Sequence, residues 1–447
     1  MAASLVMAAA LVGGLAPEVT QSTQLPVFVS AESARLRTVV ANEAPELTAF
    51  YEGRNYKPLW LKGRNARPEA QQLLDILASA EQDGLNPAHY GLTHLRKMLA
   101  ATKGGDATAL ARFEAQASRS FAAYVHDLHQ PSLERIVYTE PGASAVPLTS
   151  VGILRQAAAA PSLGEYFTKV RKMHPIYEAL RKDLAAHRAK SGPGLDARER
   201  MLLVNMDRAR VLPGNPPKRY MIVDSASAML WLYENGRPVD SMKVVVGQRG
   251  EQTPHMAGLI RYSLFNPYWN IPEDIIREDI APAVVNGGPK VIEQRQLEVL
   301  SDWSPAARVI DPKDVNWKKV AAGKYQRVRQ KPGPNNMMGR VKFMLPNKLG
   351  IYLHDTPNKA AFSQSNRWFS AGCVRVEDAQ RLTRWLYGRV PAATGPDHKV
   401  DLSEPVPVYM TYLTLAPAAG GLETRKDIYG RDSLSLAALD KRNTAAA

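Results

Sequence analysis

The chain has a single cysteine, Cys373, among 447 residues. One cysteine excludes an internal disulfide and any metal site built from several thiolates. No stretch reaches the ~18–20 consecutive apolar residues that a membrane-spanning helix requires. The sequence also lacks an evident internal repeat, zinc-finger spacing and an RNA-binding aromatic signature. We therefore expect no transmembrane segment and no nucleic-acid partner.

Basic residues outnumber acidic residues in the sequence. Lys and Arg number 57 against 43 Asp and Glu, which gives a formal net charge of +14. Such an excess attracts anionic partners, for example cell-wall polymer, a membrane surface or nucleic acid. The basic residues are dispersed along the chain, so a solvated basic surface is the simplest interpretation. The charge favours an envelope location only weakly.

The first 17 residues are rich in Ala, Leu, Val and Gly and resemble the apolar part of a secretory signal. The Lys or Arg residues that usually precede such a segment are missing. We expect residues 1–29 to be a signal-like segment and linker, and the protein to be exported to the periplasm.

Residues 30–195 are predicted to form a mostly helical scaffold domain. Apolar residues at helical spacing indicate helices over 69–80, 113–128 and 177–184. The segment 83–87, Asp-Gly-Leu-Asn-Pro, is a helix-stopping turn between the first two. This half of the chain contains no catalytic constellation.

From about residue 218 the apolar residues recur with period two, which is typical of strands. Strands are predicted at 220–224, 229–234, 239–246, 259–265, 341–345, 351–354 and 406–412. Asn235-Gly236 predicts a tight hairpin, because both positions tolerate positive φ. One helix is expected at 377–387. The sequence thus predicts an α+β protein with a β-rich catalytic domain over 196–413.

Residues 283–330 interrupt the strand pattern. The segment is polar and includes a short helical run near 292–300. An insertion of this length is often a lid over a site, and a surface elaboration is the alternative. Residues 414–447 are assigned as a C-terminal extension.

A cysteine and a histidine in the β-rich half have the residue types of a nucleophilic site. His354 ends the predicted strand at 351–354, and Cys373 follows Gly372. We expect the helix at 377–387 to place Cys373 near its N-terminus, where the helix dipole favours a thiolate. A histidine in reach takes the thiol proton. The alternative is a small buried cysteine in a glycine turn, with a strand-end histidine bonded to backbone.

Two neighbours of Cys373 fit an acyl-transfer site. Gly372 has no side chain, so a substrate carbonyl can approach the backbone closely. The amides near Gly372 and Cys373 are then candidate donors to an oxyanion. Arg375 suits a substrate carboxylate.

These residues resemble the signature of the L,D-transpeptidase catalytic domain of the YkuD type. That signature is a His, a spacer, then Ser-His-Gly-Cys followed by an apolar residue and Arg or Asn. His354 and Cys373 are 19 positions apart, which is similar to the larger periplasmic branch of the family. Ala371 departs from the pattern, because it occupies a place often held by a second His.

The resemblance extends over most of residues 50–440. The similar segments are 56–60, 83–87, 204–208, 244–247, 253–254, 266–272, 331–335, 339–343 and 427–432. Relatives commonly carry a three-helix peptidoglycan-binding module between scaffold and catalytic domains. Residues 190–205 leave no room for that module, so wall attachment is expected to come from elsewhere.

The resemblance and the local chemistry together assign candidate site residues. The catalytic candidates are Cys373 as nucleophile, His354 as general acid and base, Gly372 as an oxyanion donor through its backbone, and Asp355 as the backbone group that orients His354. The substrate-binding candidates are Arg375, Ser370, Tyr352, Trp269, Asn335 and Arg340. For Tyr352 and Trp269, packing is the alternative role.

The resemblance implies a peptidoglycan L,D-transpeptidase that needs no metal or cofactor and is acylated by carbapenems. Cys373 would attack the diaminopimelate–D-Ala bond of a tetrapeptide stem, release D-Ala and form 3→3 cross-links. Two other acceptors remain open, a free D-amino acid and an amine of an outer-membrane protein. A cysteine hydrolase of the L,D-carboxypeptidase kind and a non-catalytic wall-binding protein are the rival interpretations.

Overall fold

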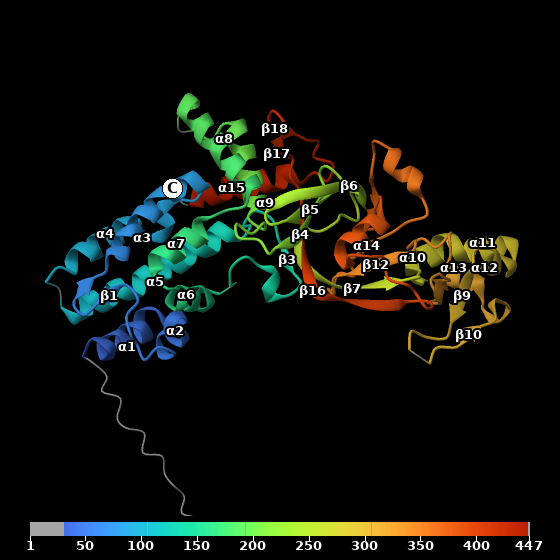
Figure 1. Cartoon of the computed structure of the whole chain (residues 1–447), viewed down its shortest axis with the longest axis horizontal. Coiled ribbons are helices and arrows are strands. Elements are labelled where there is room, and N and C mark those ends of the chain that lie inside the picture. Colours follow the sequence, from blue (N-terminus) through green and yellow to red (C-terminus); the bar gives the residue numbers. More distant parts are fainter. Residues whose placement is uncertain (1–30, 105, 148, 193, 305, 446–447) are drawn as a thin grey trace, which may run out of the picture.

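The computed structural model describes residues 31–104, 106–147, 149–192, 194–304 and 306–445. The predicted signal-like segment, 1–29, lies outside the described residues. Figure 1 shows an elongated molecule with a helical bundle at one end, a sheet in the middle and a small separate unit at the far end. Within the described ranges, no helix combines the length and the apolar character needed to cross a membrane.

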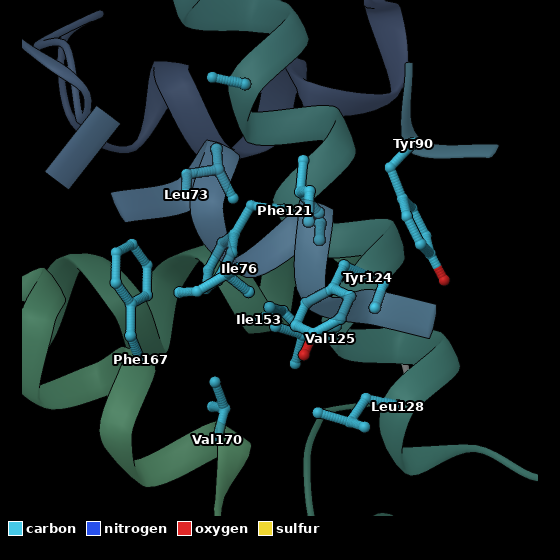
Figure 2. Close-up of a cluster of buried hydrophobic side chains, with 14 of the residues drawn as sticks. Leu73, Ile76, Tyr90, Phe121, Tyr124, Val125, Leu128, Ile153, Phe167 and Val170 are labelled. Carbon is cyan, nitrogen blue, oxygen red and sulfur yellow. The ribbon is translucent and has the colours of Figure 1, made fainter. Parts of the chain in front are cut away.

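The N-terminal half is helical, as predicted. Its helices are α1 (Ala31–Glu43), α2 (Thr48–Glu52), α3 (Pro68–Ala78), α4 (Leu92–Ala101), α5 (Ala107–His129), α6 (Ser150–Ala159), α7 (Leu163–Arg171), α8 (Pro175–Ser191) and α9 (Ala197–Ala209). Two short strands, β1 (Leu61–Lys62) and β2 (Asn65–Ala66), form a hairpin. The Asp106 side chain starts α5 by accepting hydrogen bonds from two backbone amides of the first turn. Phe121 of α5 lies fully buried at the centre of this bundle (Figure 2).

The β-rich half is built on one large sheet. Its strands are β3 (Val137–Tyr138), β4 (Arg219–Asp224), β5 (Met229–Glu234), β6 (Arg237–Gly247), β7 (Met256–Phe265), β12 (Val341–Met344), β13 (Leu353–His354), β14 (Trp368–Ser370), β15 (Val374–Val376) and β16 (His398–Thr411). Strand β12 pairs with both β13 and β7, so the sheet closes on itself around an apolar core. Helix α14 (Ala379–Tyr387) packs its apolar face against that core.

The predicted hairpin is confirmed. Strand β5 has the predicted bounds, and the turn residues Asn235 and Gly236 have φ of 51° and 77°. These positive values are the ones that Asn and Gly tolerate best.

A separate small unit interrupts the sheet between β7 and β12. It contains β8 (Trp269–Asn270), α10 (Glu273–Ile275), a π-helical turn (Ile276–Ile280), α11 (Ala281–Gly287), α12 (Lys290–Gln294), β9 (Leu297–Leu300), β10 (Val309–Ile310), α13 (Trp317–Ala321) and β11 (Arg327–Gln330). Its four strands and its apolar core are distinct from those of the main sheet. The unit therefore begins before residue 283. The predicted helical run at 292–300 is wrong in its second half, because Leu297–Leu300 forms a strand that pairs with β10 and β11.

The C-terminal segment returns to the helical half. Strands β17 (Leu415–Ala418) and β18 (Gly421–Thr424) form a hairpin, and α15 (Arg431–Ala445) follows. Leu415 of β17 and Leu439 of α15 are buried in the core of the helical bundle. Figure 1 shows α15 alongside that bundle, although the segment follows the catalytic sheet in sequence. The α+β fold class is confirmed.

Candidate active site

Cys373 lies in the turn between β14 and β15, and the helix predicted to activate it is elsewhere. Val374–Val376 directly after it forms a strand, and α14 begins only at Ala379, with Asp378 as its cap. The alternation Val-Arg-Val suits a strand whose two valines face the core. The prediction of a helix N-terminus at Cys373 is therefore wrong, because a strand separates Cys373 from α14.

Strand pairing brings the cysteine and the histidine to one face of the sheet. Strands β13 and β15 are parallel neighbours, with His354 opposite Arg375. Because side chains alternate along a strand, Cys373 and Arg375 share one face with Tyr352 and His354. Leu353 points the other way, into the core. The predicted nucleophile and base thus lie on the same face of the sheet.

His354 is arranged to be a proton acceptor. Its Nδ1 lies 2.6 Å from the backbone oxygen of Asp355, so Nδ1 carries the proton and donates. The other nitrogen, Nε2, is left as the basic atom. Burial lowers the pKa of His354 to about 3, and the positive charges of Arg375 and Lys342 act in the same direction. The imidazole is therefore neutral at physiological pH.

The Cys373 thiol is half-buried and protonated at rest. Its Sγ donates to the backbone oxygen of Gly350 at 3.6 Å. Burial raises the pKa of Cys373, while hydrogen bonding from the Tyr352 backbone and the charges of Lys342 and Arg375 oppose that rise. The resting pair is a neutral thiol beside a neutral imidazole.

The turn before Cys373 depends on Gly372. Its φ is +94°, a conformation that L side chains rarely adopt, and an added Cβ would lie 3.3 Å from Ile351. Ser370 is buried, and its hydroxyl donates to the carbonyl of Cys373 at 2.6 Å. Ser370 thus braces the turn from inside. Within the described chain, the amides of Gly372 and Cys373 have no acceptor.

Two cationic side chains approach the thiol. Arg375 has a buried Nε without a hydrogen-bond partner, and among the described residues no carboxylate pairs with it. Lys342, which lies opposite His354 on β12, places its Nζ 4.5 Å from the centre of the Tyr352 ring. Burial lowers the pKa of both cations. Sequence reasoning missed Lys342, since it lies 31 positions from the cysteine.

The carboxylate of Asp355 accepts hydrogen bonds that hold neighbouring segments in place. One oxygen accepts from the Arg340 amide at 2.9 Å and the other from Lys359 Nζ at 2.6 Å. Gly339 is required beside it, because its φ is +60° and an added Cβ would lie 2.4 Å from the carboxylate. The backbone oxygen of Asp355 is the group that contacts His354, which is the role predicted for it.

Three predicted substrate residues line cavities whose linings include neither Cys373 nor His354. Trp269 and Asn335 line a cavity of about 200 Å³ in the small unit, and neither Cys373 nor His354 lines it. Arg340 is exposed and lines a cavity of about 670 Å³ with Asp355 and residues at the start of α14. Tyr352 and Arg375 remain beside the thiol. Among the described residues, no cluster of His, Cys, Asp or Glu could hold a metal ion.

Comparisons with known proteins match two regions of the chain. A scaffold-domain model matches residues 45–184, and the model of the L,D-transpeptidase catalytic domain, YkuD, matches residues 218–408. A Haemophilus influenzae protein named "Putative L,D-transpeptidase" is 32% identical over 240 residues, which are 52% of this chain and 48% of that protein. The chain thus spans about half the length of this relative.

Two solved structures also match in part. "Structure of the Ldtfm-avibactam carbamoyl enzyme" is 11% identical, with a TM-score of 0.23 over 45% of this chain and 51% of its own. "L,D-transpeptidase from Mycobacterium smegmatis" is 12% identical, with a TM-score of 0.23 over 43% of this chain and 58% of its own. Structural similarity this low supports no conclusion about this chain. The two domain matches show that the chain contains a scaffold domain followed by an L,D-transpeptidase catalytic domain of the YkuD type.

Proposed function

We propose that this protein is a peptidoglycan L,D-transpeptidase with Cys373 as nucleophile and His354 as general acid and base. The observation that carries the proposal is the state of His354. Its Nδ1 is committed to the Asp355 carbonyl, and its basic Nε2 belongs to a neutral ring on the same sheet face as the thiol. Such a ring takes the thiol proton as the sulfur attacks.

The first half-reaction cleaves the diaminopimelate–D-Ala bond of a tetrapeptide stem. The thiol turns from Gly350 toward His354, loses its proton to Nε2, and Sγ bonds to the carbonyl carbon. The backbone amides of Gly372 and Cys373 donate to the resulting oxyanion. The carbon–nitrogen bond then breaks, and the His354 imidazolium gives its proton to the departing D-Ala amine. A thioester on Cys373 and free D-Ala result.

The second half-reaction transfers the acyl group. The side-chain amine of a second stem attacks the thioester while His354 accepts a proton from it. The carbon–sulfur bond breaks, Sγ recovers a proton, and a 3→3 cross-link forms. Water in place of the amine gives the hydrolase reaction. A free D-amino acid or a protein amine gives an exchange or attachment product.

The cations next to Cys373 are proposed to bind the donor stem. Diaminopimelate carries a free carboxylate, and Arg375 offers a guanidinium with no carboxylate partner among the described side chains. Lys342 adds a second positive charge beside Tyr352. Because peptidoglycan lies outside the cytoplasmic membrane, the proposal includes export to the periplasm. The small unit that runs from β8 to β11 is proposed as a lid over the substrate.

Product analysis tests the proposal. The purified protein is incubated with a disaccharide-tetrapeptide, and the products are separated and weighed by mass spectrometry. The expected product is a dimer lighter than two substrates by one D-Ala, with free D-Ala in equal amount. Tripeptide without dimer would support the hydrolase instead. A Cys373→Ala variant that still forms the dimer would overturn the scheme.

A further inference from the structure

Thr253 connects the loop after β6 to the turn that carries the nucleophile. Its side chain is fully buried, and its hydroxyl donates to the carbonyl of Gly372 at 2.8 Å. The same oxygen accepts a hydrogen bond from the amide of Gly247 at 2.9 Å. Gly247 has no room for a side chain, since an added Cβ would lie 2.1 Å from the backbone oxygen of Glu251. The loop and the turn are therefore locked together through one hydroxyl.

The C-terminal segment holds Thr253 from the other side. The hydroxyl of Tyr429 donates to the carbonyl of Gly247 at 2.8 Å and accepts from the Thr253 amide at 3.4 Å. Arg431 donates to the carbonyl of Thr253 at 3.0 Å and to the side chain of Gln252 at 2.7 Å. Two residues from the far end of the chain thus fix both backbone groups of Thr253.

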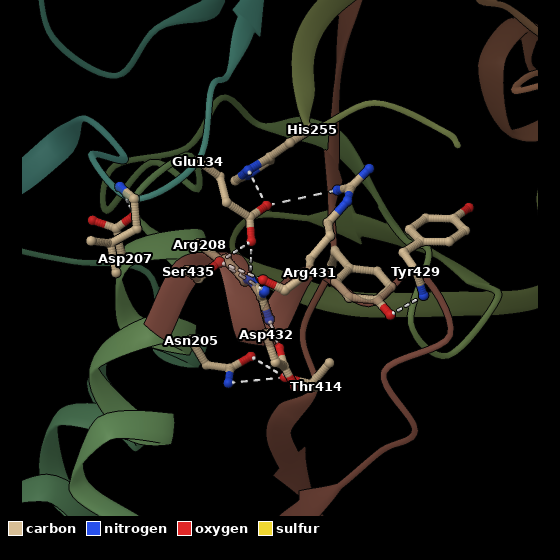
Figure 3. Close-up of polar contacts among 12 residues, drawn as sticks. Glu134, Asn205, Asp207, Arg208, His255, Thr414, Tyr429, Arg431, Asp432 and Ser435 are labelled. Carbon is tan, nitrogen blue, oxygen red and sulfur yellow. Dashed lines mark hydrogen bonds and ion pairs between the residues drawn. The ribbon is translucent and has the colours of Figure 1, made fainter. Parts of the chain in front are cut away.

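Tyr429 and Arg431 are themselves held in place. The Tyr429 ring stacks on Tyr412 with centroids 4.9 Å apart, and its amide donates to the Tyr412 hydroxyl. Arg431 lies over both rings. Figure 3 shows that Arg431 also reaches Glu134, which pairs with the buried Arg208 of α9. The clamp on Thr253 is therefore anchored in the scaffold and in α9.

The peptide bond between Gly372 and Cys373 makes this contact relevant to chemistry. A peptide unit is planar and trans, so its C=O and N–H point in opposite directions. When Thr253 holds the Gly372 oxygen, it also sets the direction of the Cys373 amide. That amide is one of the two oxyanion donors in the proposed mechanism.

We propose that Thr253, held by Tyr429 and Arg431 of the C-terminal segment, is a positioning residue that aims the Cys373 amide at the oxyanion. The inference rests on the proposed acyl-transfer function, since it assigns Thr253 a part in that reaction. The loss of this contact misdirects a donor, and removal of one oxyanion donor costs roughly 100-fold or more in rate elsewhere.

Two reactions of the same thiol separate positioning from folding. Acylation by a carbapenem forms an oxyanion, whereas alkylation by iodoacetamide forms none. Rates of both are measured by intact mass for wild type, Thr253→Val and Thr253→Ser. Thr253→Val keeps the shape and loses the hydroxyl. We expect its acylation to slow by about tenfold or more, its alkylation to change less than about twofold, and Thr253→Ser to restore acylation.

A second pair of variants tests the C-terminal clamp. Tyr429→Phe removes the hydroxyl that contacts Gly247 and Thr253, and a smaller loss confined to acylation is expected. The matched control is Tyr220→Phe, which loses a buried hydroxyl contact with His174 remote from the Gly372 turn. Wild-type acylation in Thr253→Val, or an equal fall in both reactions, would overturn the inference. Failure of wild type itself to be acylated would instead refute the proposed function.

Discussion

At Cys373, burial and nearby charge act on the thiol in opposite directions. Burial has the larger effect and raises the pKa of Cys373, although Lys342 and Arg375 supply two positive charges. His354 shows the complementary result, because burial and the same cations lower its pKa to about 3. One proton therefore stays on sulfur and the basic nitrogen stays free across the neutral range. In the mechanism that we propose, activation occurs during attack, when the proton moves to His354.

The protonated thiol predicts a definite pH dependence. Alkylation by iodoacetamide needs the thiolate, whose fraction grows about tenfold for each pH unit below the pKa. Because the pKa of Cys373 is raised above its ordinary value of 9.0, the alkylation rate should climb about tenfold per unit from pH 6 to pH 8. The measurement is the initial rate of mass addition. A rate that is flat across this range would mean that the thiol is already ionised.

The residue types at the site could be predicted, but their contacts could not. The motif around Cys373 predicted the nucleophile, and the base was predicted from His354 at a strand end. Thr253 and Tyr429 were not predicted as residues of the site. Thr253 is 119 positions from Gly372, whose carbonyl it contacts, and 176 positions from Tyr429, whose hydroxyl contacts its amide. Such distances leave no trace in a local pattern. The thiol pKa was misjudged because burial cannot be read from the motif.

The small unit that runs from β8 to β11 is structurally separate from the main sheet. It has its own four-stranded sheet and its own apolar core, which includes Val299 and Val328, both fully buried. A unit with a separate core can loosen without disturbing the main sheet. This independence is the physical requirement for the lid that we propose.

Val299→Ala tests that independence. Removing two buried methyl groups should cost about 2 kcal/mol, from lost burial and the cavity left behind. Hydrogen–deuterium exchange should then rise in peptides from residues 269–330 and stay unchanged in β4 and β5. An equal rise in both regions would show that the unit and the sheet open together.

Short strands were the elements that the sequence did not predict: Val374–Val376 was not assigned to any element and Leu297–Leu300 was predicted to be helical. The strand at Met229–Glu234 was long enough for alternation to be clear, and the Asn-Gly turn marked its end. Val374–Val376 and Leu297–Leu300 have three and four residues, too few for period two to be told from a helical run. Their strand form comes from pairing with β13 and β6 in one case and with β10 and β11 in the other.

On the scale of the whole molecule, one buried arginine joins the scaffold to the C-terminal helix. Arg208 of α9 has a side chain that is 1% exposed and pairs with Glu134 and with Asp432 of α15, each at 2.6 Å. Its remaining donors reach Thr414 and Ser435. A buried cation with all its partners in place is costly to disrupt, because its removal deprives two partly buried carboxylates of their main cationic partner.

A pair of variants measures this connection. Arg208→Ala should lower the free energy of unfolding by about 3–5 kcal/mol. The control is Arg200→Ala, which also breaks an ion pair between α9 and α15, with Asp440, but on the surface. Its cost should stay below about 1 kcal/mol. Denaturant titration gives both values, and equal costs would show that Arg208 is no more than a surface contact.

The most direct test of the account is the mass of the intact protein after incubation with a carbapenem. The β-lactam carbonyl takes the place of the stem carbonyl, so acylation requires the thiol, its base and the oxyanion donors together. We predict one adduct per chain on wild type and none on Cys373→Ala. Absence of an adduct on folded wild-type protein, or an adduct that persists on Cys373→Ala, would contradict the assignment of Cys373 as the nucleophile.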